Sequence, residues 1–120
     1  MNYIYQQQGE SGFVEGMPGD GVVQSEEEAL ELVAVCGENE TFNLLLPAEC
    51  LADDFFNLSR GLAGAVFLKF SLYRIRCAIL LPVEQAGQGR FGELVLEANR
   101  RDDALHFFID RSKAVDWLMG

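Results

Sequence analysis

An apolar run in the second half of the chain limits the folds that this sequence can adopt. Residues 75–81, IRCAILL, are rich in Ile and Leu on both faces of an extended strand. A strand of this kind has to be covered on both sides, as the central strands of parallel sheets are. The runs FNLLLP at 42–47 and LHFFI at 105–109 have the same character. Together the three runs predict interior strands of an α/β sheet.

Helical patterns separate these runs. Ser25, with Glu28 three residues later, forms a capping box and predicts a helix that Gly37 ends. One face of that helix carries Ala29, Leu32, Val33 and Cys36. The stretch 53–70 predicts a second helix, whose apolar face carries Leu62, Ala63, Val66, Phe67 and Phe70.

The remaining segments complete the predicted order. Residues 2–7 and 13–17 are two expected strands joined by a turn, and residues 90–99 and 110–119 are two expected helices. Residues 82–90 are an expected flexible loop because Gly and Pro punctuate them.

The order predicts one α/β domain over residues 1–120. Helices between apolar strands imply right-handed crossovers and a mostly parallel or mixed sheet. The two N-terminal strands are expected to form an antiparallel pair at one edge.

The charge is uneven along the chain. Of 19 acids and nine bases, 12 acids and no base lie in residues 1–59, which leaves seven acids and nine bases in residues 60–120. A net charge of −10 disfavours general nucleic-acid binding. The acidic half is either an interaction surface for a basic partner or a solvated face that keeps the protein in solution.

The N-terminus, MNYIYQQQGE, does not read as a secretory signal, and no apolar run approaches the roughly 18 residues of a membrane span. We therefore expect a cytoplasmic protein that does not enter a membrane.

The residues that most often carry catalysis or metals are few. Cys36, Cys50 and Cys77 have no C-x-x-C spacing and predict free thiols, with Cys50 as the exposed one. Acids near Cys50, such as Glu49, raise a thiol pKa and argue against an activated nucleophile. His106 stands alone in the sequence and is expected to pack inside the fold. We expect no metal, no cofactor and no catalytic set.

The start of the second helix is the main candidate site. Ser59 is the candidate N-cap, and the glycines Gly61 and Gly64 reduce helix propensity, which calls for some compensation. Arg60 in the first turn opposes the helix dipole. One interpretation is capping and close packing, and the other is an anion or phosphoserine site at these four residues.

A second candidate region follows the last strand. Ligands of open parallel sheets bind beyond the carboxyl ends of the strands, where Asp110 and Arg111 are expected. Asn99 precedes that strand, and we expect it to cap a helix at the opposite end of the sheet.

Four stretches, FFNLSRGLAGAVFLKF, YRIRCAIL, EANR and HFFID…AVDWL, resemble a bacterial family catalogued as domain of unknown function 4180. The matching residues are Phe55, Phe56, Leu58, Gly61, Ala63, Gly64, Lys69, Phe70, Tyr73, Arg74, Ala78, Ile79, Glu97, Asn99 and Phe107. Asn57, Arg60 and Ala65 stand where the family pattern has Asp, Thr and Glu. The resemblance implies no particular activity.

A weaker resemblance is to anti-sigma-factor-antagonist domains, the STAS or SpoIIAA-like domains. In LSRGLAG, Ser59 stands at the position of their phosphorylatable serine, with Gly61 and Leu62 after it. This resemblance implies a STAS-like architecture.

Two functions follow as hypotheses. The first is a non-catalytic regulatory or interaction module that binds a protein partner, with a homodimer as one form. The second is a module that binds a small anionic ligand near Ser59 and Arg60. An enzyme ranks third because one histidine and no known motif leave little to carry catalysis.

Overall fold

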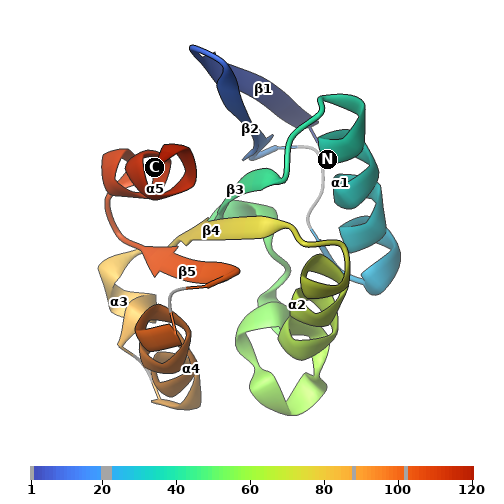
Figure 1. Cartoon of the computed structure of the whole chain (residues 1–120). Helices are drawn as coiled ribbons and strands as arrows, with labels where there is room; N and C mark the ends of the chain where they lie inside the picture. Colours follow the sequence, from blue (N-terminus) through green and yellow to red (C-terminus); the bar gives the residue numbers. More distant parts are fainter. Residues whose placement is uncertain (1, 20–22, 88, 102) are drawn as a thin grey trace.

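The computed structural model describes residues 2–19, 23–87, 89–101 and 103–120. Its five-stranded sheet has the order β1-β2-β3-β4-β5 (Figure 1). The strands are Asn2–Gln8, Ser11–Met17, Asn43–Pro47, Arg76–Leu80 and Leu105–Phe108. β1 and β2 are antiparallel, and every later neighbouring pair is parallel. The predicted single α/β domain, with an antiparallel pair at one edge of the sheet, is confirmed.

Helices cover both faces of the sheet (Figure 1). The helices are α1 (Glu26–Glu38), α2 (Leu62–Leu72), α3 (Val83–Ala86), α4 (Gly89–Arg101) and α5 (Arg111–Met119). α1, α2 and α4 pack on one face because right-handed crossovers between successive neighbouring strands all return over the same side. α5 follows the last strand and covers the other face.

Successive side chains of a strand point to opposite faces of the sheet, and the core therefore has two layers. Leu44 and Leu46 face α1, α2 and α4, whereas Leu45 between them faces α5. All three side chains are fully buried, which explains why the strand is apolar at these three consecutive positions. The predicted apolar faces of the first two helices also point into the larger layer.

α1 begins as the sequence predicts. The Ser25 hydroxyl accepts a hydrogen bond from the amide of Glu28, and the Glu28 carboxylate accepts one from the amide of Gln24 at 2.8 Å. The helix passes through Gly37 and ends at Glu38, where Asn39 is the C-cap. The predicted stop at Gly37 was therefore one residue early.

The chain between β3 and α2 differs from the prediction. Instead of one helix that starts near Ser59, it forms three short 3₁₀ turns, η1 (Ala48–Cys50), η2 (Asp53–Phe56) and η3 (Leu58–Arg60). Gly61 then adopts φ +78°, and α2 starts at Leu62 with no side-chain cap. The physical reason is Phe55, which is fully buried and packs its ring edge-on against Phe67, 5.2 Å away. Burying that ring turns the chain inward before the helix begins.

The segment predicted as a flexible loop, residues 82–90, contains α3 and the first two residues of α4. A Cβ atom on Gly92 would lie 2.9 Å from the carbonyl carbon of Gly87. Glycine at position 92 therefore lets the start of α4 pack against the end of α3.

Asn99 corrects another prediction. It lies inside α4, not at its end, and its side chain reaches the outer edge of β5. Its amide nitrogen donates to the carbonyl oxygen of Phe107 at 3.1 Å, and its side-chain oxygen accepts from the amide of Phe107 at 2.7 Å. One side chain thus satisfies both backbone groups of Phe107, as a neighbouring strand would.

None of the helices in the described ranges has the length and apolar character that crossing a membrane requires.

Candidate functional site

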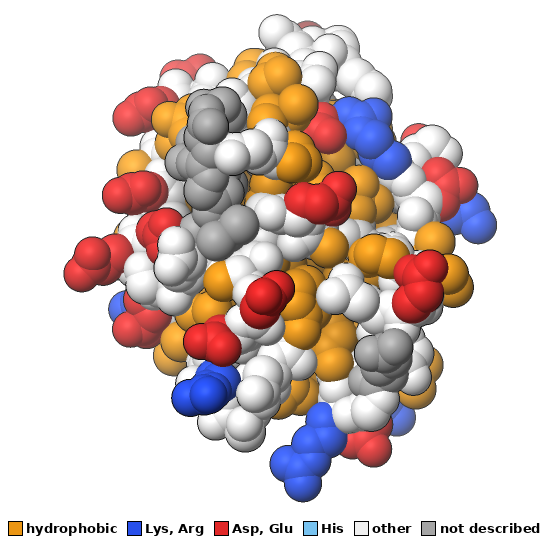
Figure 2. Space-filling view, turned by 180° about the vertical axis from the view of Figure 1, so that it is seen from behind, with side chains coloured by type: hydrophobic (Ala, Val, Ile, Leu, Met, Phe, Trp, Pro, Cys, Tyr) orange, Lys and Arg blue, Asp and Glu red, His pale blue; other side chains and the backbone are white. Residues whose placement is uncertain are grey.

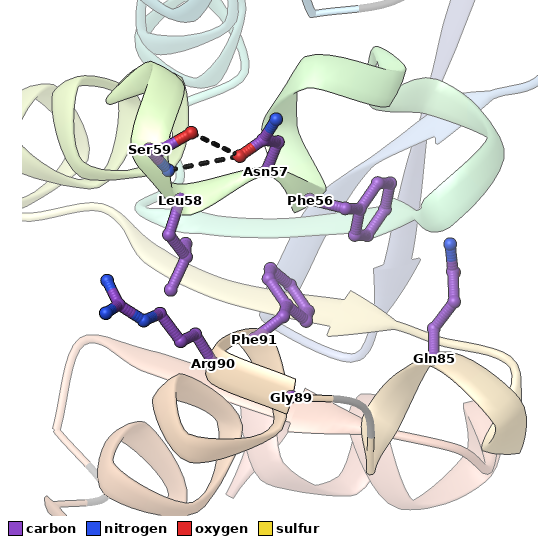
Figure 3. Close-up of a pocket in the computed structure, with 8 residues that line it drawn as sticks. All are labelled: Phe56, Asn57, Leu58, Ser59, Gln85, Gly89, Arg90 and Phe91. Atoms are coloured by element: carbon purple, nitrogen blue, oxygen red, sulfur yellow. Dashed lines mark hydrogen bonds between the residues drawn. The ribbon is translucent and has the colours of Figure 1, made fainter.

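The loops after β3 and β4 border a hollow at the carboxyl ends of these two parallel strands. Its volume is about 660 Å³, and it lies between η2 and η3 on one side and α3 and α4 on the other (Figure 3). The lining residues are Phe56, Asn57, Leu58, Ser59, Gln85, Gly89, Arg90 and Phe91. We call it the Phe56–Arg90 hollow. Its position is the one where open α/β sheets bind ligands.

The floor of the Phe56–Arg90 hollow is apolar. The rings of Phe56 and Phe91 meet edge to face with centroids 5.1 Å apart, and Leu58 extends beside them (Figure 3). Phe55 packs under Phe56 with ring centroids 5.6 Å apart and is itself fully buried. The floor is therefore held by the core and presents an apolar surface to whatever enters.

Polar groups lie around the rim. Arg90 lies on the Leu58 side and Gln85 at the other end (Figure 3). On the upper rim the hydroxyl of Ser59 donates to the side-chain oxygen of Asn57 at 2.7 Å. Among the described residues, no hydrogen bond or ion pair engages the Arg90 guanidinium. The rim thus offers one uncommitted positive charge beside an apolar floor.

The electrostatics of the Phe56–Arg90 hollow differ from those of the rest of the molecule. Among the described residues, its lining includes an arginine and no acid, although the protein carries a net charge of −10. Four other hollows among the described residues each include at least one acidic side chain. Acidic side chains are scattered over the face in Figure 2. Of these five hollows, the Phe56–Arg90 hollow is therefore the one whose lining repels an anion least.

A neighbouring hollow of about 600 Å³ continues past Phe56 and Gln85, which line both. Its lining includes Glu49 and Asp53. The two hollows form one continuous groove with an arginine toward one end and two carboxylates toward the other.

The four candidate site residues predicted at the start of the second helix do not form one site. Ser59 lines the Phe56–Arg90 hollow, but it is not the N-cap of α2, and its own amide bonds to Asn57 at 3.2 Å. Arg60 is exposed and does not line that hollow. Gly61 is explained by its positive φ, and open space surrounds the Cβ position of Gly64. Close packing of the helix on the sheet therefore explains neither glycine.

Asp110 and Arg111 have structural partners away from Ser59. Asp110 is the N-cap of α5, and hydrogen bonds from Ser112, the largest cause, hold the pKa of its carboxyl below the usual range. The Arg111 guanidinium binds the carboxylate of Glu15 on β2, with its terminal nitrogen 2.6 Å from one oxygen and Nε 3.2 Å from the other. The fork of hydrogen bonds to Glu15 raises the pKa of Arg111.

Asp110 does line a hollow, but a different one, together with Asn99 and Lys113. The prediction that Asn99 lies at the opposite end of the sheet from Asp110 was therefore wrong. The structure does not bring Asp110 or Arg111 into the lining of the Phe56–Arg90 hollow.

Sequence reasoning missed Glu15 and Arg90. Glu15 is the buried acid of β2, 8% exposed, and the one signal for it was a charge inside an otherwise apolar strand. Arg90 is the second residue of α4, and Gly87 and Gly89 just before it indicated a loop. Its role depends on which loops meet at the sheet edge, and local sequence does not carry that information.

The cysteines are all buried, so the expectation that Cys50 is exposed was wrong. Burial raises the pKa of Cys36 to about 12 and that of Cys50 to about 11, and Glu49 and Glu15 add to the effect at Cys50. Burial also raises the pKa of Cys77. Thiols with such pKa values stay protonated at neutral pH and react slowly.

His106 packs as the sequence predicts. It shares the α5 face of β5 with Phe108, on which it stacks at 4.3 Å, and lies 5.4 Å from the ring of Trp117. Arg76 covers that indole from 4.1 Å and donates to the backbone carbonyl of Trp117. These contacts give His106 a place in a packed aromatic cluster.

Within the described ranges, no group of three or more His, Cys, Asp or Glu side chains is arranged to hold a metal ion.

The fold and the groove together define a single α/β domain with a candidate binding surface at the carboxyl ends of its parallel strands. The chain belongs to the family described as the domain of unknown function DUF4180, whose model matches residues 10–118. No curated protein and no solved structure matches the chain.

Proposed function

We propose that this protein is a non-catalytic binding module whose Phe56–Arg90 hollow takes a small amphipathic anion. The observation that carries the proposal is the coincidence of an apolar floor with an arginine and no acid, on a protein with net charge −10. The apolar body of the ligand lies on Phe56, Leu58 and Phe91, and its acidic group binds Arg90. Guanidinium groups suit this role because they present several donors to a carboxylate or phosphate.

The proposed anion site differs from the site predicted near Ser59 and Arg60, because its charge is that of Arg90. Ser59 remains at the rim, but its hydroxyl is already a donor to Asn57, so the charge that attracts the anion is that of Arg90. Arg60 lies outside the lining and serves as the natural control.

A thermal shift assay with 4-phenylbutyrate tests the proposal. This probe joins an aromatic body to one carboxylate, and its amide, 4-phenylbutanamide, keeps the body without the charge. At a tenfold excess over Kd, binding to the native state alone stabilises the protein by about 1.4 kcal/mol. We expect a shift with the acid, a much smaller one with the amide, and loss of the difference in Arg90→Gln.

The matched control is Arg60→Gln, which removes the same charge two residues before α2. It should leave the shift with 4-phenylbutyrate unchanged. Equal shifts with the acid and the amide, or loss of the shift in Arg60→Gln and not in Arg90→Gln, would contradict the proposal.

Partner binding, in a cytoplasmic regulatory module of STAS-like architecture, is the second candidate function. It is supported by the exposed Tyr3, Ile4 and Tyr5 of β1, which are 46%, 44% and 36% exposed. Large apolar side chains gathered on one edge strand are typical of contact surfaces.

A further inference from the structure

The two edge strands of the sheet differ in whether their outward backbone groups have hydrogen-bond partners. At one edge the Asn99 side chain occupies both the amide and the carbonyl of Phe107 on β5. At the other edge β1 is the outermost of the described strands (Figure 1). An outermost strand presents a row of backbone donors and acceptors to which another strand can bind.

The sequence of β1 lacks the features that usually block an edge. Its seven residues, NYIYQQQ, contain no charged side chain and no proline. They pair with β2 one to one from Asn2 with Met17 to Gln8 with Ser11, so no bulge interrupts the strand. Edge strands of monomeric proteins are commonly short, charged, interrupted by a bulge or covered by another segment. β1 is long, uncharged and regular.

We propose that β1 pairs with β1 of a second copy of this chain, antiparallel, about a two-fold axis at Ile4. In this register Tyr3 lies opposite Tyr5 of the second copy, Tyr5 lies opposite Tyr3, and the two Ile4 side chains meet. Each of the large exposed side chains of the strand is then covered by another of the same group. The two sheets join into one continuous sheet across the interface.

The backbone of β1 fits this register. Gln8 and Ser11 flank the two-residue turn of the hairpin, and pairs in an antiparallel ladder alternate between hydrogen-bonded and non-hydrogen-bonded. When Gln8 and Ser11 form a hydrogen-bonded pair, every second residue of β1 back from Gln8 also bonds to β2. Tyr3 and Tyr5 lie between those residues, so their backbone amide and carbonyl groups point away from β2, to the outer edge of the sheet. These two residues then exchange hydrogen bonds across the two-fold axis, and Ile4 forms the non-hydrogen-bonded pair with its copy.

The register favours a second copy of the chain as the occupant, because Tyr3 and Tyr5 exchange places about the two-fold axis and Ile4 meets itself. The net charge of −10 and the α1 glutamates beside Tyr3 oppose the approach of two copies, but β1 itself adds no charged side chain to the contact. Aromatic pairs directly opposite each other on neighbouring strands stabilise a sheet. Because the remaining repulsion is screened by salt, the dimer should become tighter as ionic strength rises.

Disulfide trapping tests the register. In a non-hydrogen-bonded pair the Cα atoms lie about 4.5 Å apart, within the usual range for a disulfide. Ile4→Cys should therefore form a covalent dimer under mild oxidation, and the native cysteines do not compete because they are buried. Gln6→Cys is the matched control, since four residues of offset hold two copies of position 6 about 14 Å apart. A covalent dimer of Gln6→Cys as readily as of Ile4→Cys would overturn the register.

Sedimentation velocity tests the dimer itself. The wild type should be a dimer at micromolar to hundred-micromolar concentrations, and Ile4→Lys, which sets two like charges directly opposite, should weaken association at least tenfold. Leu96→Lys introduces the same charge at a more exposed side chain on α4, 73% exposed against 44% for Ile4, and should leave the dimer intact. Circular dichroism confirms that both variants fold.

A monomeric wild type at about 100 μM and high salt would overturn the inference, as would a dimer that Ile4→Lys leaves unchanged. The inference is independent of the Phe56–Arg90 hollow, because no residue of β1 lines it.

Discussion

Replacement of Asn99 by alanine should destabilise the protein by opening the edge of β5. The change removes two hydrogen bonds to Phe107, a residue that is 4% exposed and has no other strand at that edge. Each lost bond costs about 0.5 to 1.5 kcal/mol. Alanine returns about 0.5 kcal/mol through its higher helix propensity. The expected loss in free energy of unfolding is therefore about 0.5 to 2.5 kcal/mol.

Chemical denaturation measures this loss, and amide hydrogen exchange at Phe107 locates it. Leu96→Ala is the control on the same helix, because Leu96 is largely exposed and its truncation should change stability by less than about 0.5 kcal/mol. The Phe107 amide should lose protection in Asn99→Ala only. If Asn99→Ala is as stable as wild type and protects Phe107 equally, the edge-closing role assigned to Asn99 is wrong.

Four further predictions concern stability and reactivity. Gly64→Ala should stabilise the protein by up to about 1 kcal/mol in denaturant titrations, because its Cβ enters open space, whereas Gly61→Ala should destabilise it because of the positive φ. Arg111→Ala leaves the buried carboxylate of Glu15 without its ion pair and should cost about 1 to 3 kcal/mol by the same measurement, less than in a fully buried pair because the arginine side chain is half exposed. Asp110 has a folded pKa below its unfolded value, so Asp110→Ala should lower Tm at neutral pH, and the difference should shrink as pH falls below 3.8. The three cysteines should resist Ellman's reagent in the native protein and react fully in guanidinium, since burial keeps their thiol pKa values high.

The layered fold could be predicted because a strand that is buried on both faces requires apolar side chains at successive positions. Strand β3 is apolar at consecutive positions since Leu44 and Leu45 face different layers, and that pattern is visible without coordinates. The N-terminus of α1 was equally accessible, because the Ser25 capping box is a local interaction among four residues.

The candidate site was only partly predictable. Ser59 lines the candidate hollow, but the positive charge in that lining is Arg90, which comes from a different segment of the chain. The three 3₁₀ turns before α2 depend on the burial of Phe55 among rings from α2 and α4, a contact between distant segments. Asn99 is similar, because its role requires knowing that β5 is the last strand of the sheet.

An NMR titration shows directly whether the Phe56–Arg90 hollow binds amphipathic anions. ¹⁵N-labelled protein is titrated with 4-phenylbutyrate, and the backbone amide shifts are followed residue by residue. We expect saturable shifts at Leu58, Ser59, Arg90 and Phe91, with residues on the α5 face unmoved. Shifts confined to another region, or none at millimolar concentrations of the probe, would contradict it.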